Sequence, residues 1–336
     1  MKTALLTLLL VVPGVFVLNA EDTRVQKVYE KTKAVKLKVG SGDCKIASSP
    51  DGKIHVDLVY SFDKQDYEPT FNESGDTLEL GEKFLSSHSR GRSKWTVSIP
   101  DGLTFEFRAG SGGLVVKGPK VDLRTSSGSG DIDIQEAKGE FRLSSGSGDV
   151  KVFNCEIVNL SSSTGSGDQE VSKVKGKIDL RSGSGSMKIS DTEGDLGASV
   201  GSGEITIRNA KGNLGASTGS GSIRAENLTL VEKGSFSSGS GDVDVDMPSG
   251  EGFRLKVSSG SGDSLVRLKG KPAQGYFEFS TSKRHGTIVS CEPFDKEEEI
   301  QGSHHSDTTL RKSFTRGKST NQVIIRTGSG KAELSK

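Results

Sequence analysis

The triplet Gly-Ser-Gly returns along this chain at intervals that are too regular for a flexible linker. Between Gly110 and Gly260 the steps from one triplet to the next are 18, 18, 19, 18, 18, 18, 20 and 21 residues. A segment that serves only as a flexible connection has no physical reason to keep a period. A fixed period of about 20 residues is typical of repeat proteins, in which each repeat stacks on its neighbours.

Apolar residues keep fixed positions around each triplet and alternate with polar residues, as in strands with one buried face. Phe141 and Leu143 lie five and three residues before Gly146, and Val150 and Val152 lie four and six residues after it. The two pairs are nine residues apart, an odd number. An unbroken strand would therefore turn one pair away from the core, so the triplet must form a corner between two short strands.

Glycine suits such a corner because it adopts positive φ angles that other residues avoid. A second corner is predicted eleven residues after the first glycine of the triplet, at Gly139, Gly176, Gly194 and Gly212. The glycines predicted to form the structural corners of the repeat are Gly128, Gly130, Gly146, Gly148, Gly165, Gly167, Gly183, Gly185, Gly201, Gly203, Gly219 and Gly221.

Two short strands and two corners complete one coil, which cannot bury its own apolar face. Coils stacked about 4.8 Å apart would close their backbone hydrogen bonds and enclose a continuous core of Ile, Val, Leu and Phe. Serine and threonine just before the glycines would form a ladder of small residues. The sequence therefore predicts an all-β chain, a parallel β-solenoid with coils of 18 residues in most repeats. The pattern leaves open whether one coil has two faces or three.

The outlying triplets at Gly40 and Gly328 keep the same register, which favours one solenoid domain over residues 21–336. Residues 51–99 and 269–321 are then excursions from that solenoid. The second excursion contains a charged stretch, "FDKEEEIQGSHHSDTTLRKSFTRGKSTNQ", with few apolar residues. Such a composition predicts a mobile loop whose deletion leaves stability nearly unchanged.

The first residues have the features of a secretory signal peptide. Met1-Lys2-Thr3 precedes an apolar run that ends at Leu18, and Asn19-Ala20 follows it, so residues 1–20 are predicted to be removed. No membrane span is then expected. We predict export to the periplasm, the cell envelope or the medium. The 45 basic and 44 acidic residues are nearly balanced, which argues against a nucleic-acid partner.

The run "WTVSIPDGLTFEFRAGSGGLVVKG", followed by "GSGDI" and "GSGDV" units and by "NQVIIRTGSGKAELSK", resembles the "putative adhesin" family of bacterial β-strand-repeat proteins. The resemblance covers nearly the whole chain after the export segment. It implies an exported cell-envelope protein with a parallel β-solenoid fold, commonly a right-handed β-helix. It also implies a domain of unknown function with no assigned catalytic residues, so it carries over no site residue and no cofactor.

These features predict a noncatalytic envelope or surface scaffold that binds a cell-surface glycan or protein. One alternative is a polysaccharide-processing β-helix enzyme, although such enzymes interrupt their coils to build a site, and these coils are nearly uninterrupted. The other alternative is a component of envelope-stress signalling or assembly. The excursions hold most of the unusual side chains, so the candidate binding surface comprises Tyr60, Tyr67, Trp95, Tyr276 and Phe277.

Several short motifs indicate chemistry that their context does not support. "GDSL", Gly262–Leu265, matches a lipase nucleophile motif but falls at a repeat corner. The spacing of glycine and aspartate is similar to that of calcium-binding nonapeptide rolls, which need the motif in both halves of the coil. His304-His305 with Asp307 lacks further metal ligands nearby. We therefore expect no cofactor and no metal.

Three cysteines cannot all pair with one another, and their positions do not form a disulfide framework. Cys44 and Cys155 occupy apolar positions of the repeat, so they are predicted to be buried as small hydrophobic residues. The pattern gives no place to Cys291.

Overall fold

The computed structural model describes residues 22–87, 89–301 and 308–336, and these residues form β-strands joined by turns. The predicted export segment, residues 1–20, lies outside the described residues. Among the described residues, no helix is long and apolar enough to cross a membrane.

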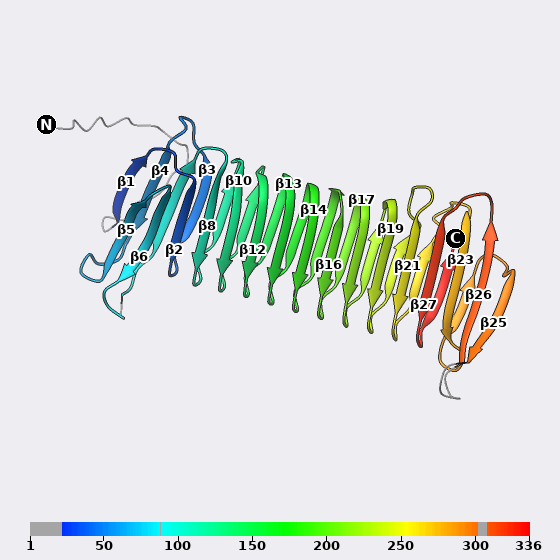
Figure 1. Cartoon of the computed structure of the whole chain (residues 1–336). Coiled ribbons are helices and arrows are strands. Elements are labelled where there is room, and N and C mark those ends of the chain that lie inside the picture. The colour runs from blue at the N-terminus through cyan, green and yellow to red at the C-terminus, as the bar shows by residue number, and fades with distance from the viewer. Residues whose placement is uncertain (1–21, 88, 302–307) are drawn as a thin grey trace.

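The strands stack side by side into a long rod, with β1 at one end and the β23–β28 region at the other (Figure 1). Strands that lead into a Gly-Ser-Gly corner form sheet I, which contains β2 (Ala34–Val39), β8 (Leu103–Ala109), β10 (Val121–Ser127), β12 (Lys138–Ser145), β16 (Leu196–Val200), β19 (Thr229–Ser238), β21 (Arg254–Ser259) and β27 (Gln322–Thr327). Strands that follow a corner form sheet II, which contains β3 (Asp43–Ser48), β9 (Leu114–Lys117), β11 (Ile132–Gln135), β15 (Met187–Glu193), β18 (Ile223–Glu226), β20 (Val243–Asp246), β22 (Ser264–Arg267) and β28 (Lys331–Ser335). Three longer strands bend through both sheets: β13 (Val150–Thr164), β14 (Gln169–Ser182) and β17 (Ile205–Thr218).

Coils pair in parallel, and equivalent residues of successive repeats stand opposite one another. In sheet II, Met187 pairs with Ile205, which pairs with Ile223 on the next coil. These side chains are buried, and together with the inward residues of sheet I they form one hydrophobic core that runs along the rod. The predicted β-solenoid and its apolar columns are therefore confirmed.

The corner changes the alternation of the chain as the sequence predicted. Phe141, Leu143 and Ser145 point inward, the next two residues, Gly146 and Ser147, are both exposed, and inward positions resume at Gly148. Two consecutive outward residues shift the alternation by one place. Sheets I and II can therefore both turn their apolar residues toward the same core.

The physical reason for glycine at the Gly-Ser-Gly corner differs from the prediction. No described Gly-Ser-Gly glycine has a positive φ. A Cβ atom on Gly148 would instead press into the carbonyl oxygen of Gly130 on the preceding coil, and the repeat corners from Gly110 onward show the same close approach. Glycine is needed because the stacked backbones touch at these corners.

Each coil also bends at two further points. Gly176, Gly194 and Gly212 have φ angles of 131°, 131° and 147°, as the second predicted corner requires. Asn154 and its equivalents adopt a left-handed conformation without glycine; they are Glu136, Lys173, Asp191, Asn209 and Asn227. Between these two bends runs a short third ladder, in which Thr192 pairs with Ala210. The coil therefore has two broad faces and one narrow edge.

We expect a glycine-to-alanine change to act very differently at the corner and on a strand face. Gly148→Ala forces two coils apart and should lower stability by about 1 to 3 kcal/mol, as overpacking does. Gly197→Ala is the matched control, because its Cβ would meet nothing nearer than 3.9 Å. The control should be neutral or slightly stabilising. Urea denaturation of both variants measures the difference, and equal losses would contradict the close-approach explanation.

The first excursion, residues 51–99, closes the N-terminal end of the rod. Its strands are β4 (Ile54–Tyr60), β5 (Tyr67–Ser74), β6 (Thr77–Phe84) and β7 (Ser93–Ile99), and β1 (Thr23–Tyr29) lies beside β4. Strands β6 and β7 extend the two sheets in parallel, whereas β5 and β4 add to them antiparallel. Atypical strands at the end of a repeat array shield the core from water.

The second excursion, residues 269–321, closes the other end. It contains β23 (Gly275–Ser282), β24 (Thr287–Ser290), β25 (Lys296–Gln301) and β26 (Thr308–Arg316). Strand β26 pairs antiparallel with β23, and β25 pairs with β26. The prediction of a mobile loop here is wrong, because Phe314 of β26 is buried and its ring stacks on Phe277 at a centroid distance of 4.9 Å. Residues 302–307, which include His304-His305, lie outside the described residues.

Candidate functional site

The corner glycines let the backbones of successive coils stack closely, and they have no side chains that could contact a ligand. Around them each corner is closed by hydrogen bonds. The Gly148 amide donates to Ser145 Oγ at 3.0 Å, and Ser145 Oγ donates to the carbonyl of Gly130 at 3.0 Å. This arrangement recurs along the rod and confirms the predicted ladder of small hydroxyl residues.

The structure buries four of the five aromatic residues predicted to form a binding surface. Trp95 and Phe277 are fully buried, Tyr67 and Tyr60 are 2% and 6% exposed, and Tyr276 alone of the five is exposed, at 37%. Buried rings cannot contact a ligand at the surface. They lie inside because each end of a solenoid leaves an open core, and large rings fill it.

Glu82 on β6 accepts hydrogen bonds from the N-terminal aromatic cluster, which includes Tyr67 and Trp95. One carboxylate oxygen, Oε1, accepts hydrogen bonds from Tyr67 Oη at 3.0 Å, from Trp95 Nε1 at 3.1 Å and from Ser93 Oγ. The other oxygen accepts from the amide of Gly40 at 2.9 Å. Burial and the adjacent Glu82 carboxylate raise the pKa of the Tyr67 phenol. Glu82 thus gives the first Gly-Ser-Gly corner the acceptor that a preceding coil supplies elsewhere.

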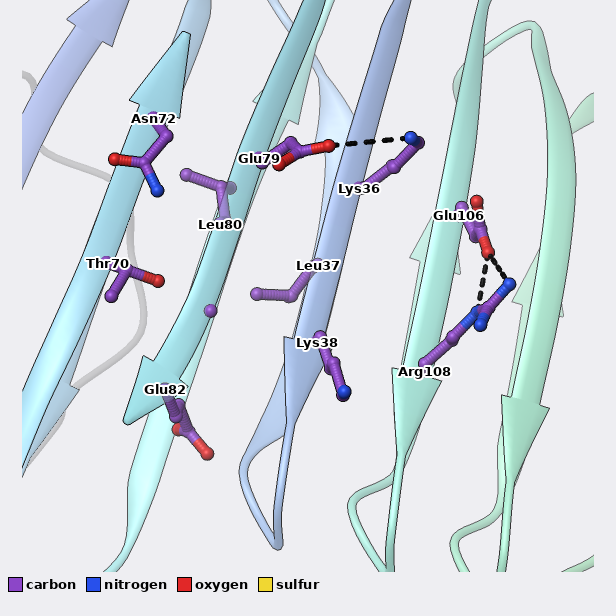
Figure 2. A pocket seen from close by; sticks show the side chains of 11 residues that line it. Lys36, Leu37, Lys38, Thr70, Asn72, Glu79, Leu80, Glu82, Glu106 and Arg108 are labelled. Carbon is purple, nitrogen blue, oxygen red and sulfur yellow. Dashed lines mark hydrogen bonds and ion pairs between the residues drawn. The ribbon is translucent and has the colours of Figure 1, made fainter. Parts of the chain in front are cut away.

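A polar groove lies beside this cluster on the outer face of sheet I, over β5, β6, β2 and β8. It has a volume of about 390 Å³. Figure 2 shows its side chains on these four neighbouring strands, with Lys36 and Lys38 on β2 between Glu79 on β6 and Arg108 on β8. Gly81 forms its floor, because it pairs with Lys38 on one side and Thr70 on the other and has no side chain of its own. The polar side chains that line the groove include Lys36, Lys38, Asn72, Glu79, Glu106 and Arg108.

Most charges of the groove are paired. Lys36 Nζ lies 3.5 Å from Glu79 Oε1, and Arg108 Nε donates to Glu106 Oε1 at 2.6 Å. Lys38 has no ion-pair partner among the described residues, and it projects from the middle of the groove (Figure 2). The groove therefore offers one unpaired cation between an amide, a hydroxyl and two ion pairs.

Chemically, this lining can donate and accept many hydrogen bonds through its amide, hydroxyl, ammonium, guanidinium and carboxylate groups. The described residues that line it include no Ser, Cys or His. Its two outer carboxylates, Glu79 and Glu106, are held by cations. Such a lining suits a ligand rich in hydroxyl and amide groups. Sequence reasoning missed this groove, because it depends on β5 and β6 folding back beside β2; the nearest signal was Lys36 and Lys38 at outward positions of a predicted strand.

A second polar feature is the ladder of aspartates that follow the corners on the sheet II side. The Asp149 amide donates to Asp131 Oδ1 at 2.8 Å, and the Asp168 amide donates to Asp149 Oδ1 at 2.9 Å. Each carboxylate thus receives a backbone donor from the next coil. Among the described residues, no group of three or more His, Cys, Asp or Glu side chains is arranged to hold a metal ion.

Because backbone donors already stabilise these carboxylates, we expect folding to need no calcium. Circular dichroism spectra and melting curves of the chain without residues 1–20 should coincide in excess chelator and in millimolar calcium. A calcium roll would gain β-structure on adding the ion. A large calcium-dependent rise in melting temperature would contradict the prediction. The ladder continues through Ser186, which donates its amide to Asp168 Oδ1 at 2.7 Å, so a carboxylate is not required at every coil.

The remaining sequence motifs have structural roles. Ser264 of "GDSL" is fully buried and donates to the carbonyl of Arg326 at 2.7 Å, so it cannot reach a substrate. Cys44 and Cys155 are unpaired and buried, as predicted, and burial raises the pKa of both thiols. Cys291 is half-buried beside the C-terminal end of the core.

Comparison with known proteins gives a family match. The profile of the Toastrack DUF4097 family matches residues 32–289. No curated protein matches the chain.

Solved structures align with nearly the whole chain at low identity. A "putative adhesin" from Parabacteroides distasonis is 12% identical over 94% of this chain and 96% of that chain, with a TM-score of 0.38. A "putative lipid binding protein" from the same species is 13% identical over 95% and 98%, with a TM-score of 0.35. A "putative cell adhesion protein" from Clostridium sporogenes is 12% identical over 94% and 99%, with a TM-score of 0.24. At these scores the likenesses support no inference about a ligand or a mechanism.

Proposed function

The chain belongs to the Toastrack DUF4097 family, and from this premise we propose that it is a noncatalytic binding scaffold, exported to the cell envelope or surface, that holds a ligand on the side of its rod. The observation that carries the proposal is the closure of both ends. A finite rod whose ends are closed presents its broad faces to other molecules.

Charged and aromatic side chains at each end support the proposal that the rod is finite. Lys27 on the terminal strand β1 has its Nζ 4.1 Å from the centre of the Phe71 ring, and the terminal strand β25 at the other end carries Lys296 and Glu297–Glu299. Charges on terminal strands oppose the addition of further strands. We infer that the rod acts as one unit and does not extend into a fibre.

The groove over Gly81 is the proposed contact site. It lies on a rigid sheet face, and its lining is rich in hydrogen-bonding groups with one unpaired cation, Lys38. These properties fit a glycan or a polar protein segment better than an apolar ligand. We favour a binding role over polysaccharide processing, because Glu79 and Glu106 are paired with Lys36 and Arg108 and the coils of the rod are nearly uninterrupted.

The test is binding of the chain without residues 1–20 to an array of bacterial surface polysaccharides and to immobilised bacterial envelope fractions. We expect Lys38→Ala to weaken the strongest binding by at least about threefold, as loss of one exposed charge contact does. Gly81→Ala, which fills the groove floor without changing charge, should weaken it too.

Lys188→Ala is the matched control, because Lys188 is an exposed strand lysine on sheet II. It should bind like the unmodified chain. If Lys38→Ala and Lys188→Ala weaken binding equally, the groove is not the contact site. If the array shows no binding to any glycan or envelope fraction, the scaffold proposal itself fails.

A further inference from the structure

The aspartate ladder on the sheet II side has a gap at Gly113. At most corners a residue with a side chain follows the second glycine, as Asp43 and Asp131 do, but "GSGG" places a third glycine at position 113. The coil of Gly113 lies between the coils of Asp43 and Asp131. The Gly113 amide donates to Asp43 Oδ1 at 2.9 Å, so the ladder continues from the coil of Asp43 to that of Gly113. Gly113 itself has no side chain that could accept a hydrogen bond from the coil of Asp131.

The Asp131 amide is therefore left without the partner that its equivalents have. On the next two coils, the Asp149 and Asp168 amides each donate to the carboxylate of the preceding rung. Among the described residues, no acceptor is found for the Asp131 amide. A Cβ atom on Gly113 would lie 3.4 Å from the Asp131 carbonyl oxygen and 3.9 Å from the Asp131 nitrogen, so this amide borders the place of the missing side chain.

The gap opens into a hollow of about 560 Å³ on the outer face of sheet II. Lys45, Lys94 and Lys151 line it. Lys45 and Lys151 have no ion-pair partner among the described residues. Four carboxylates also line the hollow, those of Asp43, Asp131, Asp133 and Asp149. Each of them already accepts a hydrogen bond, from a backbone amide in three cases and from the Gln135 side chain at Asp133. The hollow thus combines one unpaired backbone donor with unpaired cations.

We propose that this gap binds the carboxylate group of a ligand, which takes the place of the missing ladder side chain. One oxygen of the ligand carboxylate accepts a hydrogen bond from the Asp131 amide, as the Asp131 carboxylate accepts one from the Asp149 amide. The other oxygen faces the lysines. The chain places a carboxylate in this position on neighbouring coils, so the geometry is one that the ladder already tolerates. A charge-assisted hydrogen bond to a backbone amide is stronger than a neutral one.

A uronic acid residue of a polysaccharide and an acidic peptide share this chemistry. The test follows the Asp131 amide by nuclear magnetic resonance with selective 15N-aspartate labelling. Digalacturonate is the first probe, N-acetylaspartate amide the second, and glucose the neutral control. We expect saturable shifts of the Asp131 resonance with a carboxylate probe and none with glucose. Tighter binding of digalacturonate would point to an acidic glycan, and tighter binding of the aspartate derivative to a peptide.

Gly113→Asp supplies the missing carboxylate from the chain itself. The change is sterically open, because a Cβ there meets nothing nearer than 3.4 Å and φ is not positive. In Gly113→Asp, the Asp131 amide resonance should shift in the absence of ligand and should no longer respond to either probe. Gly113→Ala leaves the gap open and should respond like the unmodified chain, whereas Lys45→Ala should bind about threefold more weakly.

A second ladder-filling variant covers the case in which Gly113→Asp does not fold. Gly113→Ser copies Ser222, whose Oγ accepts the Asp242 amide at 3.2 Å, and it should also abolish the response. The proposal is overturned if the Asp131 resonance does not respond to either carboxylate, or if a folded ladder-filling variant responds as strongly as the unmodified chain.

Discussion

Deletion of residues 296–319, with Asp295 joined to Thr320 through a short turn, is expected to destabilise the C-terminal end of the rod strongly. The deletion removes β25 and β26 and uncovers the rings of Phe277 and Phe279, which are now fully buried. Exposing each ring should cost about 1.5 to 3 kcal/mol. Urea denaturation should show the loss, and a dye that binds exposed apolar surface should fluoresce more strongly with the shortened chain.

A single substitution separates this effect from a mere change of chain length. Phe314→Ala keeps the hairpin but removes the ring that stacks on Phe277, and it should cost about 3 to 5 kcal/mol. Phe153→Ala is the matched control, since Phe153 is 40% exposed on sheet II. Unchanged melting of both the shortened chain and Phe314→Ala would mean that the charged stretch does not seal the core.

The second large effect is expected from Ile205→Asp in the middle of the rod. Ile205 is fully buried and pairs with Met187 and Ile223 on the adjacent coils. An unpaired carboxylate in this column should cost several kcal/mol and should break the stack locally or unfold the chain.

Its neighbour gives the control for charge. Thr206 points outward between Lys188 and Arg224 on the adjacent coils. Thr206→Asp therefore places a carboxylate between two cations and should leave the melting temperature nearly unchanged. Circular dichroism melting of both variants measures the contrast, and similar losses would contradict the assigned register.

The repeat itself could be predicted because its interactions are local and periodic. Each Ile or Val column needs only the same apolar residue on the next coil, so the period of the sequence carries the register directly. The same holds for Ser145 and its equivalents, whose hydroxyls close every corner. The position of the glycine corners was predicted correctly, but the predicted reason, a positive φ angle, was wrong at the Gly-Ser-Gly corners. Only the stacking of the coils in the structure shows that a Cβ of Gly148 would strike the carbonyl of Gly130.

The site could be predicted much less well. The groove over Gly81 needs Thr70 and Asn72 on β5 beside Lys38 on β2, and β5 reaches that place through an antiparallel hairpin with β6. No period of the sequence encodes that pairing. In the sequence, Gly113 is one of several corners without an aspartate, and its meaning depends on the Asp131 amide that it leaves without an acceptor.

By itself, the sequence determined that this chain is a β-solenoid and which side chains fill its core, because each coil meets a near copy of itself. Only the tertiary structure decided how the rod ends. A terminal coil has no copy on one side, so non-repeating segments must cover it. This is why Trp95, Tyr67 and Phe277, which look like ligand contacts in the sequence, lie inside. It is also why the charged stretch around Lys296 pairs as an edge strand on β26, which places the aromatic ring of Phe314 over the core.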